Sequence, residues 1–117
     1  MLEWYIDDIS NLIIRNVLML QNNEDVDNKT KESIKLFDIM EWKNKTENMK
    51  NHIKEEKENS PDDERNMNIK EENAIKNINA WETYIKLIHD KQDWSGLASL
   101  LLEASSKVES FIMYMSL

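Results

Sequence analysis

The sequence of 117 residues has no cysteine, one glycine (Gly96) and one proline (Pro61). Without cysteine the chain forms no disulfide, no thiolate nucleophile and no cysteine-ligated zinc or iron–sulfur site. Phosphate-binding loops, dinucleotide-binding fingerprints and nucleophile elbows each need two or more glycines at fixed offsets, so enzymes built on them are excluded. A chain of this length buries roughly 65% of its unfolded surface, and a hydrophobic core is therefore feasible without a covalent cross-link.

Basic charge and long apolar runs are also scarce. Aspartate and glutamate number 23 against 15 lysines and arginines, which gives a net charge of -8. Because such a surface repels phosphates on average, we expect no nucleic-acid partner. No run reaches the roughly 18 uncharged apolar residues of a membrane span, so we expect no membrane partner. Residues 1–8 carry acidic side chains where a signal peptide has basic ones, which predicts a cytoplasmic protein.

Apolar residues recur at steps of three and four, the spacing of a helix with one buried face. In the helix expected over residues 2–21 the apolar stripe covers most of the circumference, which predicts a helix that is either central or binds a partner. A second helix is expected over 29–56, capped by Asp27 or Asn28. Its buried face is predicted to carry Leu36, Ile39, Trp42, Met49 and Ile53.

The second half of the chain predicts a helical hairpin. One helix is expected over 61–90, with Pro61 at its first position, and another over 94–115, capped by Asp93. Because the link between them is short and both apolar seams are regular, the two helices should pack antiparallel. The seams are Met67, Ala74, Ile78, Trp81, Ile85 and Ile88, then Trp94, Leu97, Leu101, Ala104, Val108, Phe111 and Met115. The sequence therefore predicts an all-α fold, an antiparallel four-helix bundle forming a single domain over 1–117.

Residue types that carry chemistry do not form catalytic or metal-binding patterns. Neither His52 nor His89 has the glutamate three residues before it that a carboxylate-bridged metal pair in a bundle requires. Adjacent carboxylates point about 100° apart on a helix and do not converge on one substrate. We therefore expect no enzyme activity, no metal and no cofactor. Glu71, at a seam position, fits either a bundle end that reaches water or a register-setting ion pair with Lys43 or Lys107.

Apolar side chains in excess of one core face indicate a candidate partner-binding surface. In the first helix these residues are Ile14 and Leu18. In the C-terminal tail they are Ile112, Met113 and Leu117, within a methionine-rich segment of the kind that adapts to irregular partners. Two interpretations stay open: the tail binds a partner, or it packs across the open edge beside the first helix.

An acidic residue and an aromatic, Asp93 and Trp94, precede a Leu-Ala-x-x-Leu run at residues 97–101. With the apolar seam before it, the segment 81–108 resembles the C-terminal hairpin of small helical-bundle proteins of Gram-positive bacteria. It is similar, more loosely, to flagellar export chaperone-like bundles. Where that pattern continues with a second acidic-apolar segment, this chain has Ala-Ser-Ser at 104–106. The resemblance implies a cytoplasmic, non-enzymatic bundle that holds a partner helix in an apolar groove.

Two functions from different classes follow. The first is a protein-interaction module, chaperone-like or adaptor-like, that binds an amphipathic helix of a protein partner, or a second copy of the chain as a homodimer. The second is an acidic phage or viral inhibitor that mimics nucleic acid and blocks a host nucleic-acid-binding protein. Small size and negative charge fit it, but the carboxylates concentrate between Glu55 and Glu72 instead of being spread in two strand-like rows. Ionic strength separates the two, because charge-based binding weakens steeply with salt and apolar binding does not.

Overall fold

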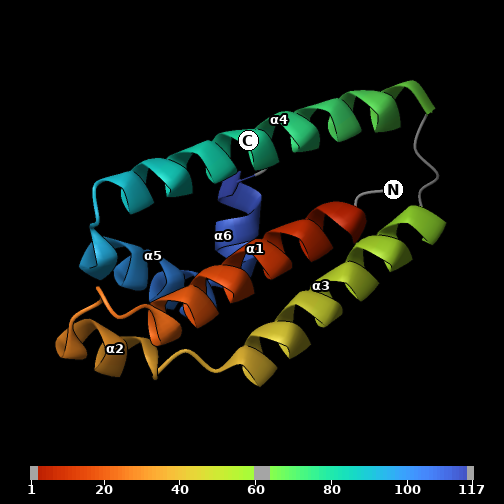
Figure 1. Cartoon of the computed structure of the whole chain (residues 1–117). Helices are drawn as coiled ribbons and strands as arrows, with labels where there is room; N and C mark the ends of the chain where they lie inside the picture. Colours follow the sequence, from red (N-terminus) through yellow and green to blue (C-terminus); the bar gives the residue numbers. More distant parts are fainter. Residues whose placement is uncertain (1–2, 60–63, 116–117) are drawn as a thin grey trace.

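The computed structural model describes the backbone of residues 3–59 and 64–115, and within it the side chains of residues 3–55 and 71–114. This part of the chain forms six α-helices and no strand (Figure 1). The helices are α1 (Glu3–Asn22), α2 (Asn28–Ile34), α3 (Ile39–Asn59), α4 (Glu64–Asp90), α5 (Trp94–Ser106) and α6 (Val108–Met115). The predicted all-α fold is confirmed, but six helices stand where four were expected.

Helix α1 lies at the centre of the fold. It runs between α3 and α4, and α2 and α5 pack against its C-terminal half (Figure 1). Its fully buried side chains are Ile6, Ile9, Ile13, Val17 and Leu20. Burying each of these stabilises the fold by at most about 1.5–3 kcal/mol. The wide apolar stripe seen in the sequence is thus explained by a central helix with neighbours on several sides.

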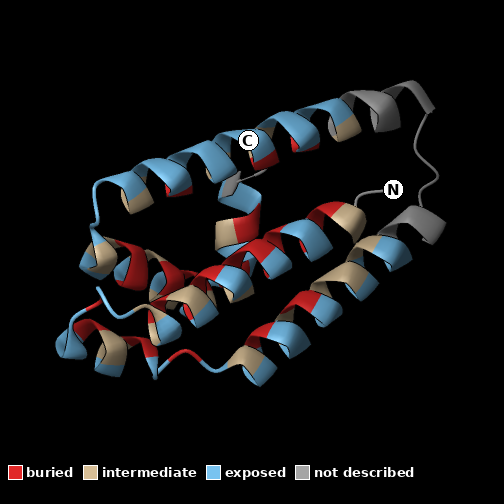
Figure 2. Ribbon diagram, in the orientation of Figure 1, coloured by how far each residue is buried: buried red, intermediate tan, exposed pale blue. Residues whose placement is uncertain are grey.

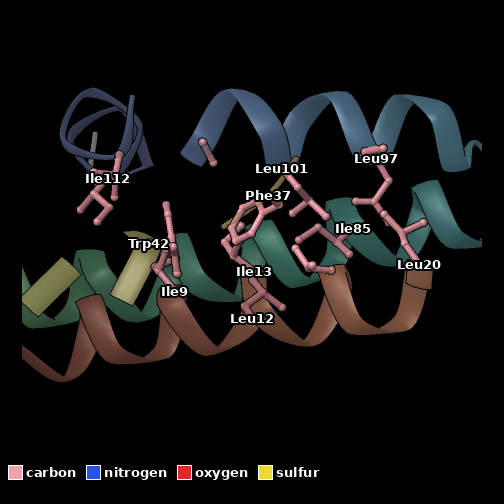
Figure 3. Packing of buried hydrophobic residues seen from close by; sticks show 14 of the residues in the cluster. Ile9, Leu12, Ile13, Leu20, Phe37, Trp42, Ile85, Leu97, Leu101 and Ile112 are labelled. Atoms are coloured by element: carbon pink, nitrogen blue, oxygen red, sulfur yellow. The ribbon is translucent and has the colours of Figure 1, made fainter. Parts of the chain in front are cut away.

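The core forms where α1 meets α4 and α5. In Figure 3, Ile13 and Leu20 of α1 point toward α5, where Leu101 and Leu97 lie, and Ile85 of α4 reaches into the same cluster. Figure 2 shows α4 with buried residues toward α1 and α5 and exposed residues along its outer face. The three-and-four spacing in α4 and α5 therefore identified the buried faces of both helices.

The single helix predicted over 29–56 was wrong: the structure has two helices separated by residues 35–38. Asp27 caps helix α2, as expected, because its carboxylate accepts a hydrogen bond from the Thr30 backbone N–H at 3.0 Å. Hydrogen bonds from the side chain and backbone of Thr30 lower the pKa of Asp27 from its ordinary value. Helix α3 has a cap of its own, since Asp38 Oδ1 accepts from the Glu41 N–H at 3.0 Å.

This break changes which residues reach the core. Leu36, predicted to be buried, is 78% exposed, and Phe37 occupies the core in its place. Phe37 packs on Trp42, with ring centroids 5.9 Å apart. Trp42 is fully buried, as its spacing predicted, and the later seam residues Met49 and Ile53 are half-buried against the core.

Helices α4 and α5 form the predicted antiparallel hairpin (Figure 1). Asp93 caps α5 as expected, because its carboxylate accepts from the Gly96 N–H at 3.0 Å. Gln92, in the connecting turn, has a φ of 56°, the left-handed conformation typical of a helix end. The expected helix start at Pro61 and the side chain of Met67 lie outside the described residues.

The uninterrupted helix predicted over 94–115 was also wrong, because the chain bends at Lys107. This residue has a φ of -131° and a ψ of 47° and separates α5 from α6. The carbonyl of Glu103 accepts from both the Lys107 N–H and the Ser106 hydroxyl, each at 3.0 Å. A serine hydroxyl bonded back to its own helix favours bending. Beyond Lys107, α6 runs in a new direction toward α4 (Figure 1).

Candidate functional site

Large apolar side chains are exposed mainly on α4 and α6. Among the described residues, the exposed ones are Leu18, Leu36, Met40, Ile75, Tyr84, Leu87, Met113 and Tyr114. Five of these eight belong to α4 or α6. Tyr84 and Leu87 are three residues apart, so they share a face of α4. The surplus apolar surface therefore lies mostly on the second half of the chain.

The first candidate site is an apolar groove between α4, α5 and α6, with a volume of about 690 Å³. We call it the aromatic groove. Its apolar lining consists of Ala80, Trp81 and Tyr84 of α4, Leu100 of α5, and Phe111 and Tyr114 of α6. Glu103, Lys107 and Ser110 add polar groups to its lining. It therefore offers one carboxylate and one ammonium group beside a mostly apolar surface.

Trp81 is the centre of the aromatic groove. Its ring centroid lies 5.6 Å from that of Tyr84, 5.6 Å from that of Phe111 and 6.1 Å from that of Tyr114. The Tyr84 and Tyr114 contacts are edge-on, a favourable geometry for aromatic pairs. Tyr84 is 50% exposed and Tyr114 66% exposed. The groove thus presents two accessible phenol rings held in place by a half-buried indole.

A second groove, on the other flank of α6, has a volume of about 960 Å³ and is bounded by α1, α3 and α6. We call it the methionine groove. Its apolar lining includes Tyr5, Ile6, Met49, Ile53, Ile112 and Met113. Lys45 also lines it, and the Lys45 ammonium group donates to the Ser105 carbonyl at 2.9 Å and pairs with Glu41 at 3.0 Å. This lysine joins α3 to the C-terminal end of α5.

The five residues predicted to bind a partner do not form one surface. Ile112 and Met113 both line the methionine groove, but Ile112 is only 2% exposed and is a core residue. Ile14 is half-buried against the core and Leu18 is 43% exposed, and neither lines either of the two grooves. Leu117 lies outside the described residues. Helix α6 itself packs against α3, α4 and α5.

Sequence reasoning missed the main residues of the aromatic groove. Trp81 and Phe111 were placed in the core, and Tyr84 and Tyr114 were not singled out. A signal was present in α4, where Ala80, Tyr84 and Leu87 form a second stripe at helical spacing beside the seam. No comparable signal showed that α6 would turn toward this stripe.

Polar groups elsewhere are engaged in the packing of helices. The Asn16 amide donates to the Leu12 carbonyl at 2.7 Å, so its oxygen accepts from His89 Nε2 at 2.8 Å. The His89 ring also contacts Trp94 edge-on, with centroids 5.4 Å apart. Glu71 is half-buried.

Metal-binding clusters and membrane-spanning helices are absent from the described part of the chain. There, no three side chains of the types His, Asp and Glu are grouped so that they could hold a metal ion. None of the helices there combines the length and the apolarity needed to cross a bilayer. Comparison of the chain with models of protein families, with curated proteins and with solved structures found no match.

Proposed function

We propose that the chain is a non-enzymatic protein-interaction module, chaperone-like or adaptor-like, that holds an amphipathic helix of a protein partner in the aromatic groove. The observation that carries this proposal is the cluster of Trp81, Tyr84 and Tyr114, in which two large rings are exposed on a surface already fixed by packing. Monomers rarely expose contiguous apolar patches without a use for them. Tyrosine and tryptophan also dominate the binding energy of protein interfaces.

The shape of the groove favours a helix as the bound element. Tyr84 lines the groove, and the exposed Leu87 lies one turn further along the same face of α4, outside the groove lining. This spacing matches anchors at positions i, i+3 or i+4 of a partner helix. Glu103 and Lys107 in its lining supply charges of both signs, which can fix the direction in which the helix lies. We also propose that the module acts in the cytoplasm, as a variant four-helix bundle in which α2–α3 and α5–α6 each replace one long helix.

A capture experiment with matched variants tests the groove. The Tyr84→Ser/Tyr114→Ser pair removes the two exposed rings, and Leu36→Ser/Met40→Ser removes two exposed apolar side chains near the α2–α3 link. For proteins that the wild type captures from a lysate, recovery should fall at least about tenfold with the tyrosine variant. Recovery should change little with the control variant. Because all four side chains are exposed, each single change should alter stability by no more than about 0.5 kcal/mol. Equal loss with both variants, or no loss with either, contradicts the proposal.

The alternative function is an acidic phage or viral inhibitor that mimics nucleic acid. The net charge of -8 supports it. Repeating the capture at low and moderate salt distinguishes the two functions, because binding through carboxylates falls steeply with ionic strength and binding in an apolar groove barely changes. Capture that disappears with salt and is indifferent to the tyrosine variant would favour the inhibitor.

A further inference from the structure

Helix α6 is separated from α5 by one non-helical residue, although the sequence repeat runs through the break. The seam positions Ala104, Val108 and Phe111 follow one another at steps of four and three, as they would in a straight helix. Only Lys107 departs from helical geometry, with a ψ of 47°. The same residues are therefore compatible with a bent arrangement and with one continuous helix.

A few polar contacts secure the bent arrangement. In a continuous helix, the carbonyl of Ser105 would accept from the backbone N–H of Glu109, four residues on. In the bent chain this carbonyl accepts from the Lys45 ammonium group instead. The Ser106 hydroxyl bonds back to Glu103 on the exposed side of the helix. Both hydrogen bonds are made by side chains, so opening the bend breaks none of the backbone hydrogen bonds within α5 or α6.

The apolar side chains of α6, by contrast, are anchored on other helices. Ile112 is buried at the methionine groove, and Phe111 contacts Trp81 of α4. The helix packs on α3 and α4 as well as on α5. Straightening the chain at Lys107 would pull these side chains out of the core. A lone straightened copy is therefore disfavoured, because it exposes apolar surface that the bent copy buries.

We propose that Lys107 is a hinge through which two copies of the chain exchange α6. In the resulting dimer, α5 and α6 of each copy form one straight helix, and α6 occupies the other copy's position beside α3 and α4. The helix that fits the position beside α3 and α4 is α6 of a second copy, because it has the same side chains as the α6 that packs there in the bent chain. Exchange restores the apolar contacts of α6 with α3 and α4 and adds the helical hydrogen bonds missing at the bend. Each aromatic groove then takes Phe111 and Tyr114 from the partner copy. The inference goes beyond the proposed function and does not depend on which helix binds in the groove.

Two sets of variants change the hinge in opposite directions. The Lys45→Met/Ser106→Ala pair removes the two hydrogen bonds that secure the bend and should raise the dimer association constant about tenfold. Its matched control is Lys43→Met/Ser99→Ala, since both of these residues are exposed on the same two helices. Val108→Pro places proline at the first position of α6, where it is tolerated, and blocks a continuous helix, so it should lower association at least tenfold. Val108→Ala controls for the lost side chain.

The dimeric fraction, at twice the chain mass of 14.0 kDa, is measured by light scattering during size-exclusion chromatography. The protein concentration is varied up to millimolar. Circular dichroism identifies any variant that has failed to fold. A loosened variant that is folded and no more dimeric than its control overturns the proposal, whatever Val108→Pro does. The proposal is also overturned if the wild type forms measurable dimer and a folded Val108→Pro variant dimerises as strongly.

Cross-linking identifies which copy supplies α6. The natural chain has no cysteine, so Met49→Cys in α3 and Met113→Cys in α6 provide the only two thiols, both in the methionine groove. A short bis-maleimide should join them within one chain in the monomer fraction, which is the internal reference. In an exchanged dimer the same reagent should join two chains on a denaturing gel. Dimers that yield only single-chain products would show that α6 stays in its own copy.

Discussion

At the scale of single residues, the pair formed by Trp42 and Ser10 shows how the core accommodates a polar group. Trp42 is fully buried, and its indole Nε1–H donates to the Ser10 hydroxyl at 3.0 Å. Ser10 is itself buried on α1. Because a buried donor without an acceptor loses the hydrogen bond it would make to water, the serine is what allows α3 to place its largest side chain against α1.

Ser10→Ala should therefore lower the free energy of unfolding by about 1–3 kcal/mol, because it leaves the buried indole N–H without an acceptor. Ser99→Ala, on the exposed face of α5, is the matched control and should change it by no more than about 0.5 kcal/mol. Urea denaturation followed by tryptophan fluorescence measures both values. Equal stabilities of the two variants would mean that the serine contributes nothing to placing Trp42.

At the scale of helices, the N-termini of α2 and α5 are each capped by a single aspartate. At α5, Asp93 accepts from the Gly96 N–H, and a Cβ added to Gly96 would collide with that carboxylate. Glycine at this position therefore leaves room for the capping carboxylate, although alanine is preferred within a helix by about 1 kcal/mol. At α2, Asp27 plays the equivalent role toward Thr30.

Gly96→Ala should leave stability nearly unchanged in the wild type, because the gain in helix propensity is offset by displacement of the cap, each about 1 kcal/mol. In an Asp93→Ala background no carboxylate remains to be displaced, and the same change should stabilise by about 1 kcal/mol. Thermal melting of the four proteins in this double-mutant cycle gives the coupling. An equal gain from Gly96→Ala in both backgrounds would show that the cap and the glycine are independent.

The cap of α2 predicts a dependence on pH. Hydrogen bonds from Thr30 lower the pKa of Asp27, so the folded state favours the ionised carboxylate. Its contribution is therefore present above the ordinary pKa of 3.8 and is lost as the pH falls through the lower folded value. Asp27→Asn keeps a capping oxygen without a titrating proton. Relative to that variant, the wild type should lose stability on acidification below about pH 4, and parallel pH curves for the two proteins would contradict this origin of the shift.

At the scale of the molecule, periodicity predicted most of the helices and core faces but not how the helices are joined. The breaks at residues 35–38 and at Lys107 interrupt no apolar repeat, so spacing alone passed over them. A local polar contact accompanies each break, from Asp38 in one case and from Ser106 in the other. The same side chains also occur in uninterrupted helices, which is why they give no reliable signal.

The site was harder to predict than the fold because it depends on these joints. Trp81 meets Phe111 and Tyr114 only because α6 turns toward α4 after Lys107. In a straight helix over 94–115, Phe111 continues the seam and Tyr114 falls outside it, so the spacing gives no sign that both meet Trp81. Ile112 was assigned to the candidate partner-binding surface because it falls outside the regular seam, whereas in the structure it is buried.

The central position of α1 has a consequence for how the protein is made. This helix leaves the ribosome before every element that covers it, and the face that meets Leu97 and Leu101 has no neighbour until α5 has been synthesised. At about 5–20 residues per second, translation from Asn22 to Ser106 takes several seconds. For that period the side of α1 that faces α5 is without its partner. The native core therefore closes only late in synthesis, once α5 is available to cover that side of α1.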